Sequence, residues 1–348
     1  MTLTLSHIIE QAEDFTQREI HCKPEQSKIK IYSQRDWQEF CKKNNFEQES
    51  HGLYIPQRKR AYLQTESPFF ITNLFHEYFG HGLFYEHSLV GKELEKILEN
   101  GEGGNTFLQQ RRSSSAFGLG KTHHEDYEGF ALWLEAKLCN ELGYQELWER
   151  REKTLPEPHR IIYNFFTQAE QKFTPFGFLA QLGFPKYYHS DKIKNFLQAV
   201  YQEQWKNIDM ALLYGSQKPY SDMDLFVVSN NSRNFFNGWL DIYELERTEF
   251  HYLLERFDIS VTEAISTGTP IHGENMWRQA QEQIKTQHIK KNAARHNRRK
   301  AEELREKTIF TSEREKRITL SYEISYRKAG EFLTQGNRVL GKRDLFPI

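Results

Sequence analysis

The feature that most constrains the fold of this chain is a pair of apolar runs joined by a short polar segment. The first run, Ala211–Ser216, ends in a Gly-Ser pair, and the second, Ser221–Val228, opens with the pattern Asp-x-Asp. Asp222 and Asp224 are two residues apart, so on a strand they point to the same face, where carboxylates can hold the divalent cations that bridge nucleotide phosphates. A Gly-Ser turn lets the backbone approach a triphosphate, and its hydroxyl donates to phosphate oxygen. The pattern predicts two neighbouring strands with a metal and nucleotide site where they meet.

The segment of roughly residues 190–275 resembles the polymerase-β-like nucleotidyltransferase superfamily, and within it the small minimal nucleotidyltransferase domains. The resemblance implies that Asp222 and Asp224 bind Mg²⁺ or Mn²⁺. It also implies that a nucleoside triphosphate is the substrate, from which a nucleoside monophosphate passes to a hydroxyl group of a protein or an RNA. The nucleotide-binding residues that it implies are Gly215, Ser216 and Ser221.

A third carboxylate normally completes such a metal clamp. The family carries it at the start of a later strand, which places it here on Asp241, in the run Leu240–Phe250. Asp258 is the alternative. The family's closing pattern, a helix that ends in glycine followed by a short strand, is matched by Ala264–Ile271. That match puts Asp258 beyond the sheet position and favours Asp241.

A second motif lies in the N-terminal half, where residues 76–81 have the sequence His-Glu-Tyr-Phe-Gly-His. The common zinc-binding helix has its two histidines four residues apart on one face, with the glutamate acting on a metal-bound water. His76 and His81 are five residues apart, which in a regular α-helix swings the second imidazole about 140° from the first. Binding of one metal by both histidines therefore requires a π-type turn or a bend, and Gly80 is a suitable place for it.

This motif resembles the His-Glu-x-x-Gly-His helix of the dipeptidyl peptidase III family, which is a gluzincin-like group of zinc metallopeptidases. That family takes its third ligand from a later Glu-x-x-Ala sequence, which occurs here at Glu128–Ala131. Glu77 would then take a proton from the water in the fourth coordination position. Glu125 is the alternative third ligand, and His123 or His124 is the candidate to stabilise the oxyanion. The Zn²⁺ ligands that the resemblance implies are His76, His81 and Glu128.

The whole sequence predicts an α+β chain with two domains and a tail. Residues 1–185 are expected to form a mostly helical, zinc-peptidase-like domain with a small hairpin, Gly52–Pro56 and Arg60–Gln64, which could offer an edge strand to extended substrate. Residues 186–284 are expected to form a mixed-sheet nucleotidyltransferase domain, and residues 285–348 a basic helical tail. The strands predicted in the second domain are Ile208–Tyr214, Leu225–Ser229 and Leu240–Leu245.

Charge is distributed unevenly along the chain. The net charge is −1, but the segment from Lys285 to the end contains 17 Lys or Arg against 8 Asp or Glu. Residues 285–307 have little apolar face and predict a solvated arm, with contact to nucleic-acid phosphates as the alternative. Ser321–Leu333 predicts an amphipathic helix that packs on the transferase domain or on a partner protein.

Composition also indicates the compartment. No run approaches the roughly 20 apolar residues that a membrane helix requires. The three cysteines are scattered and are not arranged in metal-binding pairs, which is typical of a reducing cytoplasm. We therefore expect a cytoplasmic protein with no membrane contact.

Together the two motifs predict a bifunctional protein, in which a zinc-dependent peptidase is fused to a Mg²⁺-dependent nucleotidyltransferase that acts on a protein or on an RNA such as tRNA. Analogy suggests a toxin–antitoxin or phage-defence setting. One alternative is a transferase alone, with an inactive peptidase-like domain that recruits the target. Another is a regulator that senses nucleotide without turnover.

Overall fold

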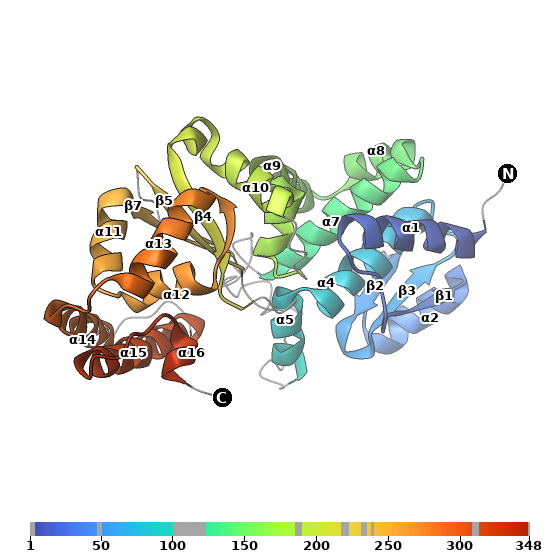
Figure 1. Cartoon of the computed structure of the whole chain (residues 1–348). Helices are drawn as coiled ribbons and strands as arrows, with labels where there is room; N and C mark the ends of the chain where they lie inside the picture. The colour runs from blue at the N-terminus through green and yellow to red at the C-terminus, as the bar shows by residue number, and fades with distance from the viewer. Residues whose placement is uncertain are drawn as a thin grey trace. The chain divides into compact units, whose positions relative to one another are not determined.

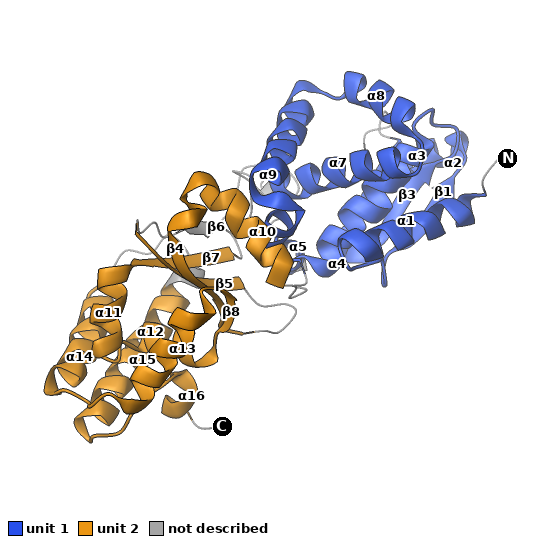
Figure 2. Cartoon of the chain, turned by 45° about the horizontal axis from the view of Figure 1, so that its top comes forward, with its two compact units in different colours: residues 1–187, 237–239 blue, residues 188–236, 240–348 orange. Residues whose placement is uncertain are grey.

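The fold is seen in a computed structural model, which describes residues 4–46, 51–99, 123–184, 190–216, 223–230, 235–237, 240–307 and 313–346. The chain divides into two units, each of which combines helices with a small mixed sheet (Figure 2). Unit 1 comprises residues 1–187 and 237–239, and unit 2 comprises residues 188–236 and 240–348. The chain is therefore α+β, as the sequence pattern predicts.

The sheet of unit 1 contains the predicted hairpin. Strands β2 (Gly52–Ile55) and β3 (Arg60–Gln64) are antiparallel, and the short 3₁₀ turn η1 (Pro56–Arg58) joins them. Strand β1 (Lys28–Tyr32) pairs with β3 in parallel, so the order is β1-β3-β2 and β2 lies at an edge. Helix α2 (Gln34–Asn44) contacts the sheet through an aromatic cluster around Trp37.

The other regular elements among the described residues of unit 1 are helices (Figure 1). They are α1 (Leu5–Glu19), α3 (Phe70–Asn73), η2 (Leu74–His81), α4 (Gly82–His87), α5 (Leu89–Glu99), α7 (His123–Glu141), α8 (Gln145–Thr154) and α9 (Glu157–Gln181). Helix α9 is kinked at Thr174, because the following Pro175 excludes helical geometry from the residue before it. The core is built around aromatic rings: Phe75, Phe79, Phe84, Phe130, Phe166 and Phe178 are fully buried.

Unit 2 is organised around a five-stranded sheet in the order β6-β7-β5-β4-β8. Its strands are β4 (Ile208–Tyr214), β5 (Met223–Ser229), β6 (Phe235–Asn237), β7 (Leu240–Glu246) and β8 (Thr269–His272). The three longest strands are those that the sequence predicts, because their apolar residues are buried on both faces of the sheet. β5 is parallel to β7 and antiparallel to β4, which makes this sheet mixed.

Helices surround this sheet. They are α10 (Ser190–Tyr201), the 3₁₀ turn η3 (Gln202–Asn207), α11 (Arg247–Glu255), α12 (Ile259–Thr267) and α13 (Glu274–Thr286). Helix α12 ends at Gly268 and leads into β8, which is the closing pattern expected from the sequence. Its apolar residues Val261, Ala264 and Ile265 pack in one core with Leu212 of β4.

Three C-terminal helices belong to unit 2: α14 (Lys291–Arg305), α15 (Glu313–Thr334) and α16 (Lys342–Leu345). Helices α14 and α15 lie side by side, and α12 lies between them and the sheet (Figure 1). The expectation of a solvated arm is wrong for α14, because one of its faces is buried. That face is formed by small residues and by residues that make hydrogen bonds, namely Ala293, Ala294, His296, Asn297 and Ala301. The mean hydropathy of the segment is therefore low.

No helix among the described residues is long and apolar enough to cross a membrane.

Candidate functional site

The helix that carries His76 and His81 has the geometry that their spacing requires. Residues Leu74–His81 form a π-helix, η2, between the α-helical segments α3 and α4. A π-helix closes its hydrogen bonds between residues five apart, so residues at this spacing lie one turn apart on one face. The two imidazole rings accordingly lie 4.7 Å apart between centroids, at an interplanar angle of 87°. The prediction of a π-type turn is confirmed.

Gly80 brings this π-helix close to α7. A β-carbon at Gly80 would lie 2.7 Å from both Cα and Cβ of Ala131, a separation that side chains do not tolerate. Glu128 lies three residues before Ala131, and residues three apart are neighbours on one helical face. The contact between the smallest residue of one motif and the small residue of the other therefore places the Glu128 carboxylate opposite the two histidines.

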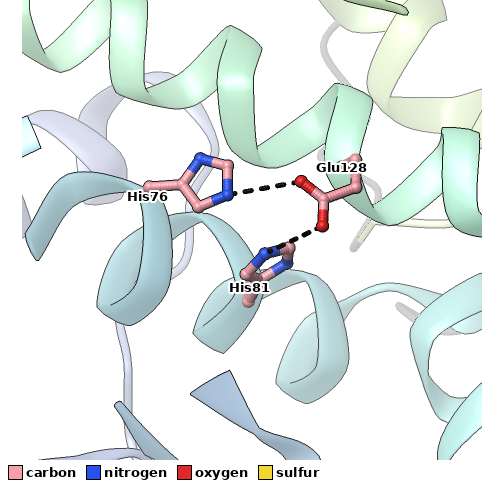
Figure 3. Close-up of side chains that lie close together, drawn as sticks. All are labelled: His76, His81 and Glu128. Atoms are coloured by element: carbon pink, nitrogen blue, oxygen red, sulfur yellow. Dashed lines mark ion pairs between the residues drawn. The ribbon is translucent and has the colours of Figure 1, made fainter. Parts of the chain in front are cut away.

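The structure brings His76, His81 and Glu128 together in unit 1 (Figure 3). One nitrogen from each imidazole and one carboxylate oxygen all lie within 4.8 Å of one another. The Nε2 atom of His76 is 3.4 Å from Oε2 of Glu128, and Nε2 of His81 is 3.8 Å from Oε1. Two imidazoles and one carboxylate that converge in this way form a set of donors that can hold a divalent metal.

Glu77 lies beside this cluster and does not belong to it. Its Oε2 atom is 4.0 Å from Nε2 of His81. Strand β2 approaches it closely, since a β-carbon at Gly52 would lie 3.0 Å from Cγ of Glu77 and 3.2 Å from Oε1. Burial raises the pKa of Glu77 to about 7. A buried carboxylate next to the metal donors is suited to accept and return a proton.

A second carboxylate, Glu135, orients His76, and the sequence reasoning missed it. Glu135 is fully buried on α7, and its Oε2 atom is 3.0 Å from Nδ1 of His76. Its other oxygen lies 3.4 Å from Nε of Arg151 on α8. Metal-binding histidines characteristically bond a carboxylate through their second nitrogen. The available signal was its spacing: Glu135 follows Glu128 by seven residues, which is two turns on the same face of α7.

The electrostatics of the cluster favour a divalent cation. Glu77, Glu128 and Glu135 place three carboxylates in a buried space, and Arg151 is the positive side chain beside them. Burial acts to lower the pKa of His76, but its bonds to Glu128 and Glu135 outweigh this and raise that pKa to about 10. The two carboxylates bonded to His76 thus favour positive charge at this point, which a metal cation could supply.

His81 is held in the neutral form. Burial is the main reason that its pKa falls to about 3. Its Nδ1 atom is buried and has no hydrogen-bond partner among the described residues, whereas Nε2 faces the Glu128 carboxylate. A neutral imidazole with a ring nitrogen directed at a carboxylate and a second imidazole is the form that binds metals. These residues thus fit a bound metal.

A cavity of about 650 Å³ opens onto the cluster. Along one side it is lined by the edge strand β2, and the cluster residues and Glu77 line another part. His159 of α9 also lines it, with Nε2 3.9 Å from Oε2 of Glu128, and this residue was missed because nothing local in the sequence links it to the motif. Tyr127 is a further lining residue.

The alternatives considered from the sequence have different positions. Glu125 is partly buried and does not join the three-residue cluster found among the described residues. His124 bonds the hydroxyl of Tyr127 through Nδ1, at 2.8 Å, and is not among the described residues that line the cavity. The side chain of His123 lies outside the described part of the chain.

In unit 2, the candidate nucleotide site lies where β4 ends. Asp224 of β5 is in register with Asp241 of β7 on one side and with Tyr214 of β4 on the other. Registered residues on neighbouring strands point to the same face, about 4.8 Å apart at the backbone, so the two carboxylates converge. Ser216 follows β4 and is exposed. Ser221 and Asp222, which the sequence assigns to this site, lie outside the described residues.

Gly215 is required by the close approach of Asp224. Its φ of +77° lies in the left-handed region that favours glycine, and a β-carbon there would lie 2.2 Å from Oδ2 of Asp224. The sequence pattern predicts a glycine here for the close approach of a phosphate. The structure gives a further reason, since the Asp224 carboxylate occupies the space in which a side chain would lie.

Asp258, the rival third carboxylate, has a structural role. It is the N-cap of α12, where its side chain accepts from the Ser260 amide at 3.0 Å. It also bonds Nε2 of His296 on α14 at 2.8 Å and the hydroxyl of Tyr326 on α15 at 2.9 Å. Fully buried, it ties the C-terminal helices to α12, and none of these partners belongs to the Asp224–Asp241 pair.

No protein-family profile matches this chain, and no curated protein is significantly similar to it.

Proposed function

We propose that unit 1 is a zinc-dependent peptidase. The observation that carries the proposal is the convergence of His76, His81 and Glu128 on one point, with Glu77 beside them, in a cavity. Two nitrogen donors and one carboxylate are typical of catalytic zinc sites, which keep a fourth position open. Bound there, zinc would supply a Lewis acid next to the carbonyl to be hydrolysed.

The residues of the chain supply the remaining parts of the reaction. Strand β2 lines the cavity at the edge of its sheet, and an extended peptide can add to such an edge through main-chain hydrogen bonds. Glu77 accepts the proton of the attacking water and returns it to the leaving amine. Glu135 fixes the ring of His76, and His159, which lines the same cavity, would donate to the developing oxyanion.

Metal binding gives the first test. Purified protein is expected to contain about one equivalent of zinc, because three ligands and one open position define a single site. Zinc at 1,000 times its Kd should stabilise the apo-protein by about 4 kcal/mol, since the folded state binds it and the unfolded state does not. The measurements are metal analysis by mass spectrometry and thermal melting of the chelator-treated protein.

His81→Ala should abolish both the zinc content and the stabilisation. His124→Ala is the matched control, because it removes a nearby histidine that lies outside the cluster, and it should keep both. Zinc-free protein that hydrolyses peptides at the full rate would contradict the proposal.

A second activity, nucleotidyl transfer, is proposed for unit 2. The observation that favours it is the register of Asp224 with Asp241 beside the tight Gly215 turn. Magnesium bound there would stabilise the charge that develops on the attacking and leaving oxygens. Asp222 would complete the carboxylate set, and Ser216 would donate to a phosphate.

The test is to incubate the protein with Mg²⁺ and each of the four nucleoside triphosphates labelled at the α-phosphate. Total RNA and the protein itself serve as acceptors. Transfer of label with release of one pyrophosphate per label is expected. Nucleotide binding without any release of pyrophosphate would instead identify a sensor and would overturn this proposal.

A further inference from the structure

An open groove of about 980 Å³ lies on the C-terminal helices of unit 2. It follows the first half of α14 and the end of α15, two helices that run side by side (Figure 2). Its apolar lining residues are Ile289, Ala294 and Leu333, of which Ile289 is partly exposed and the other two are buried. Six cationic side chains line it, and all are exposed: Lys290, Lys291, Arg295, Arg298, Arg299 and Arg338.

Few carboxylates compensate this charge. Glu302 is the one acidic residue among the described residues that line the groove. Lys290 pairs with Glu255 at 3.4 Å and Arg299 with Glu303 at 3.3 Å, but both cations are about 60% exposed, and exposed pairs of this kind are weak. The groove therefore keeps a strong positive potential.

Two of the arginines are held in place by neutral acceptors. Nη2 of Arg298 donates to the hydroxyl of Thr334 at 2.8 Å, and Nη1 of Arg338 donates to the carbonyl of Ile284 at 2.8 Å. Each bond orients a guanidinium group without neutralising it, and each leaves further N–H donors for a ligand. Oriented guanidinium groups of this kind bind phosphate oxygens in a bidentate manner.

The scaffold beneath these side chains is helix α14, which packs against α15. On α14, positions 291, 295, 298 and 299 follow helical spacing on one face, while the opposite face is buried. A β-carbon at Gly330 of α15 would lie 2.7 Å from Cγ of Arg298, so the stem of this arginine crosses α15 in close contact. Four of the six cationic groups therefore project from α14, which packs against α15, while Lys290 precedes α14 and Arg338 follows α15.

From this geometry we propose that the groove binds the phosphodiester backbone of a single nucleic-acid strand. The polar lining consists almost wholly of donors, and a phosphodiester backbone presents acceptors with one charge per nucleotide. An acidic peptide fits less well, because it also presents an amide donor at each residue, for which the groove offers few acceptors. The partly exposed Ile289 provides apolar surface for a sugar or a base.

The position of the groove also suggests what the strand does, and this step rests on the proposed transferase. Tyr322 of α15 packs against the core cluster that contains Ile259 of α12, and α12 contacts β4, the strand that leads into Gly215. Leu333, in the groove, follows Tyr322 by eleven residues on the same helix, or roughly 16 Å. A strand in the groove could thus present its end as the acceptor hydroxyl.

The test is fluorescence anisotropy with a labelled 20-nucleotide single-stranded RNA and, separately, the corresponding DNA, in the absence of nucleotide and Mg²⁺. The triple variant Lys291→Gln/Arg295→Gln/Arg299→Gln should raise Kd more than about tenfold at 50 mM salt, and should reduce the slope of log K against log salt by about 2. The matched control is Lys285→Gln/Arg305→Gln/Arg317→Gln, which removes the same charge from exposed positions outside the groove.

The control triple is expected to bind like the unmodified protein, and so is Asp224→Asn, which separates binding from transfer. Equal losses in both triples would show that net charge and not the groove attracts the strand, and would overturn the proposal. The proposal would also be overturned if polyglutamate displaced the probe as effectively as unlabelled RNA at the same concentration of charge. The groove would then be a site for acidic peptides. Circular dichroism confirms that each variant is folded.

Discussion

Glu77→Gln is expected to lower the rate of peptide hydrolysis by about 10²- to 10⁴-fold, which is the usual contribution of a general acid–base group. Glutamine keeps the shape of the side chain, which matters because strand β2 approaches Glu77 closely at Gly52. It cannot accept the proton of the attacking water. Because Glu77 is not one of the three clustered residues, the variant should keep its full zinc content.

The measurement is hydrolysis of a mixed library of fluorogenic peptides, with zinc analysis of the same preparation. The matched control is Glu125→Gln. It removes a carboxylate that lies three residues before Glu128 on α7 and does not belong to the cluster. This control should retain both activity and zinc. Loss of zinc in Glu125→Gln would identify Glu125 as the third ligand, and unchanged hydrolysis in Glu77→Gln would contradict the proposed role of Glu77.

Those parts of the fold that local pattern determines could be predicted from the sequence. The hairpin β2–β3 and the strands β4, β5 and β7 have bounds close to those expected, because runs of apolar residues end at glycine, proline or charged residues. The π-helix could also be predicted, for a different reason. The five-residue spacing of His76 and His81 fits a single metal only with a π-type turn or a bend, and the structure has the π turn.

What sequence pattern could not predict depends on tertiary contacts. The parallel pairing of β1 with β3 joins strands about 30 residues apart and leaves β2 at the edge of the cavity. Glu135, Arg151 and His159 reach the cluster from three helices, and no spacing links the last two to the motif. These residues orient the ligands and balance their charge, so they were found only in the structure.

Helix α14 illustrates a different limit. Its buried face consists of alanines and of polar groups whose hydrogen bonds are made inside the protein, such as His296 with Asp258. On a hydropathy scale such a face does not stand out as apolar, although alanine and Gly330 allow very close packing of the helices. The same contacts explain the structural role of Asp258, because its carboxylate bonds His296 of α14 and Tyr326 of α15.

Asp224→Asn and Asp241→Asn are each expected to lower nucleotidyl transfer by about 10³-fold, the upper range for loss of one group that stabilises charge in a transition state. The reason is their register on neighbouring parallel strands. Two carboxylates so close together repel each other unless a cation lies between them, and asparagine at either position removes a ligand of that cation while keeping the shape. Transfer of an α-labelled phosphate in the presence of Mg²⁺ measures the effect.

Asp209→Asn is the matched control for these two variants. Asp209 lies on β4, at the end of the strand away from Gly215, and pairs with the exposed Arg247. Its substitution removes one carboxylate from the same sheet and should leave transfer almost unchanged, because Asp209 lies at the opposite end of β4 from the position in register with Asp224. Asp258→Asn should instead lower the melting temperature, because it loses bonds to His296 and Tyr326. Transfer by the protein that remains folded should be kept. If Asp258→Asn abolished transfer in protein that is still folded, while Asp241→Asn did not, the third carboxylate would be Asp258 and the proposed site would have to be redrawn.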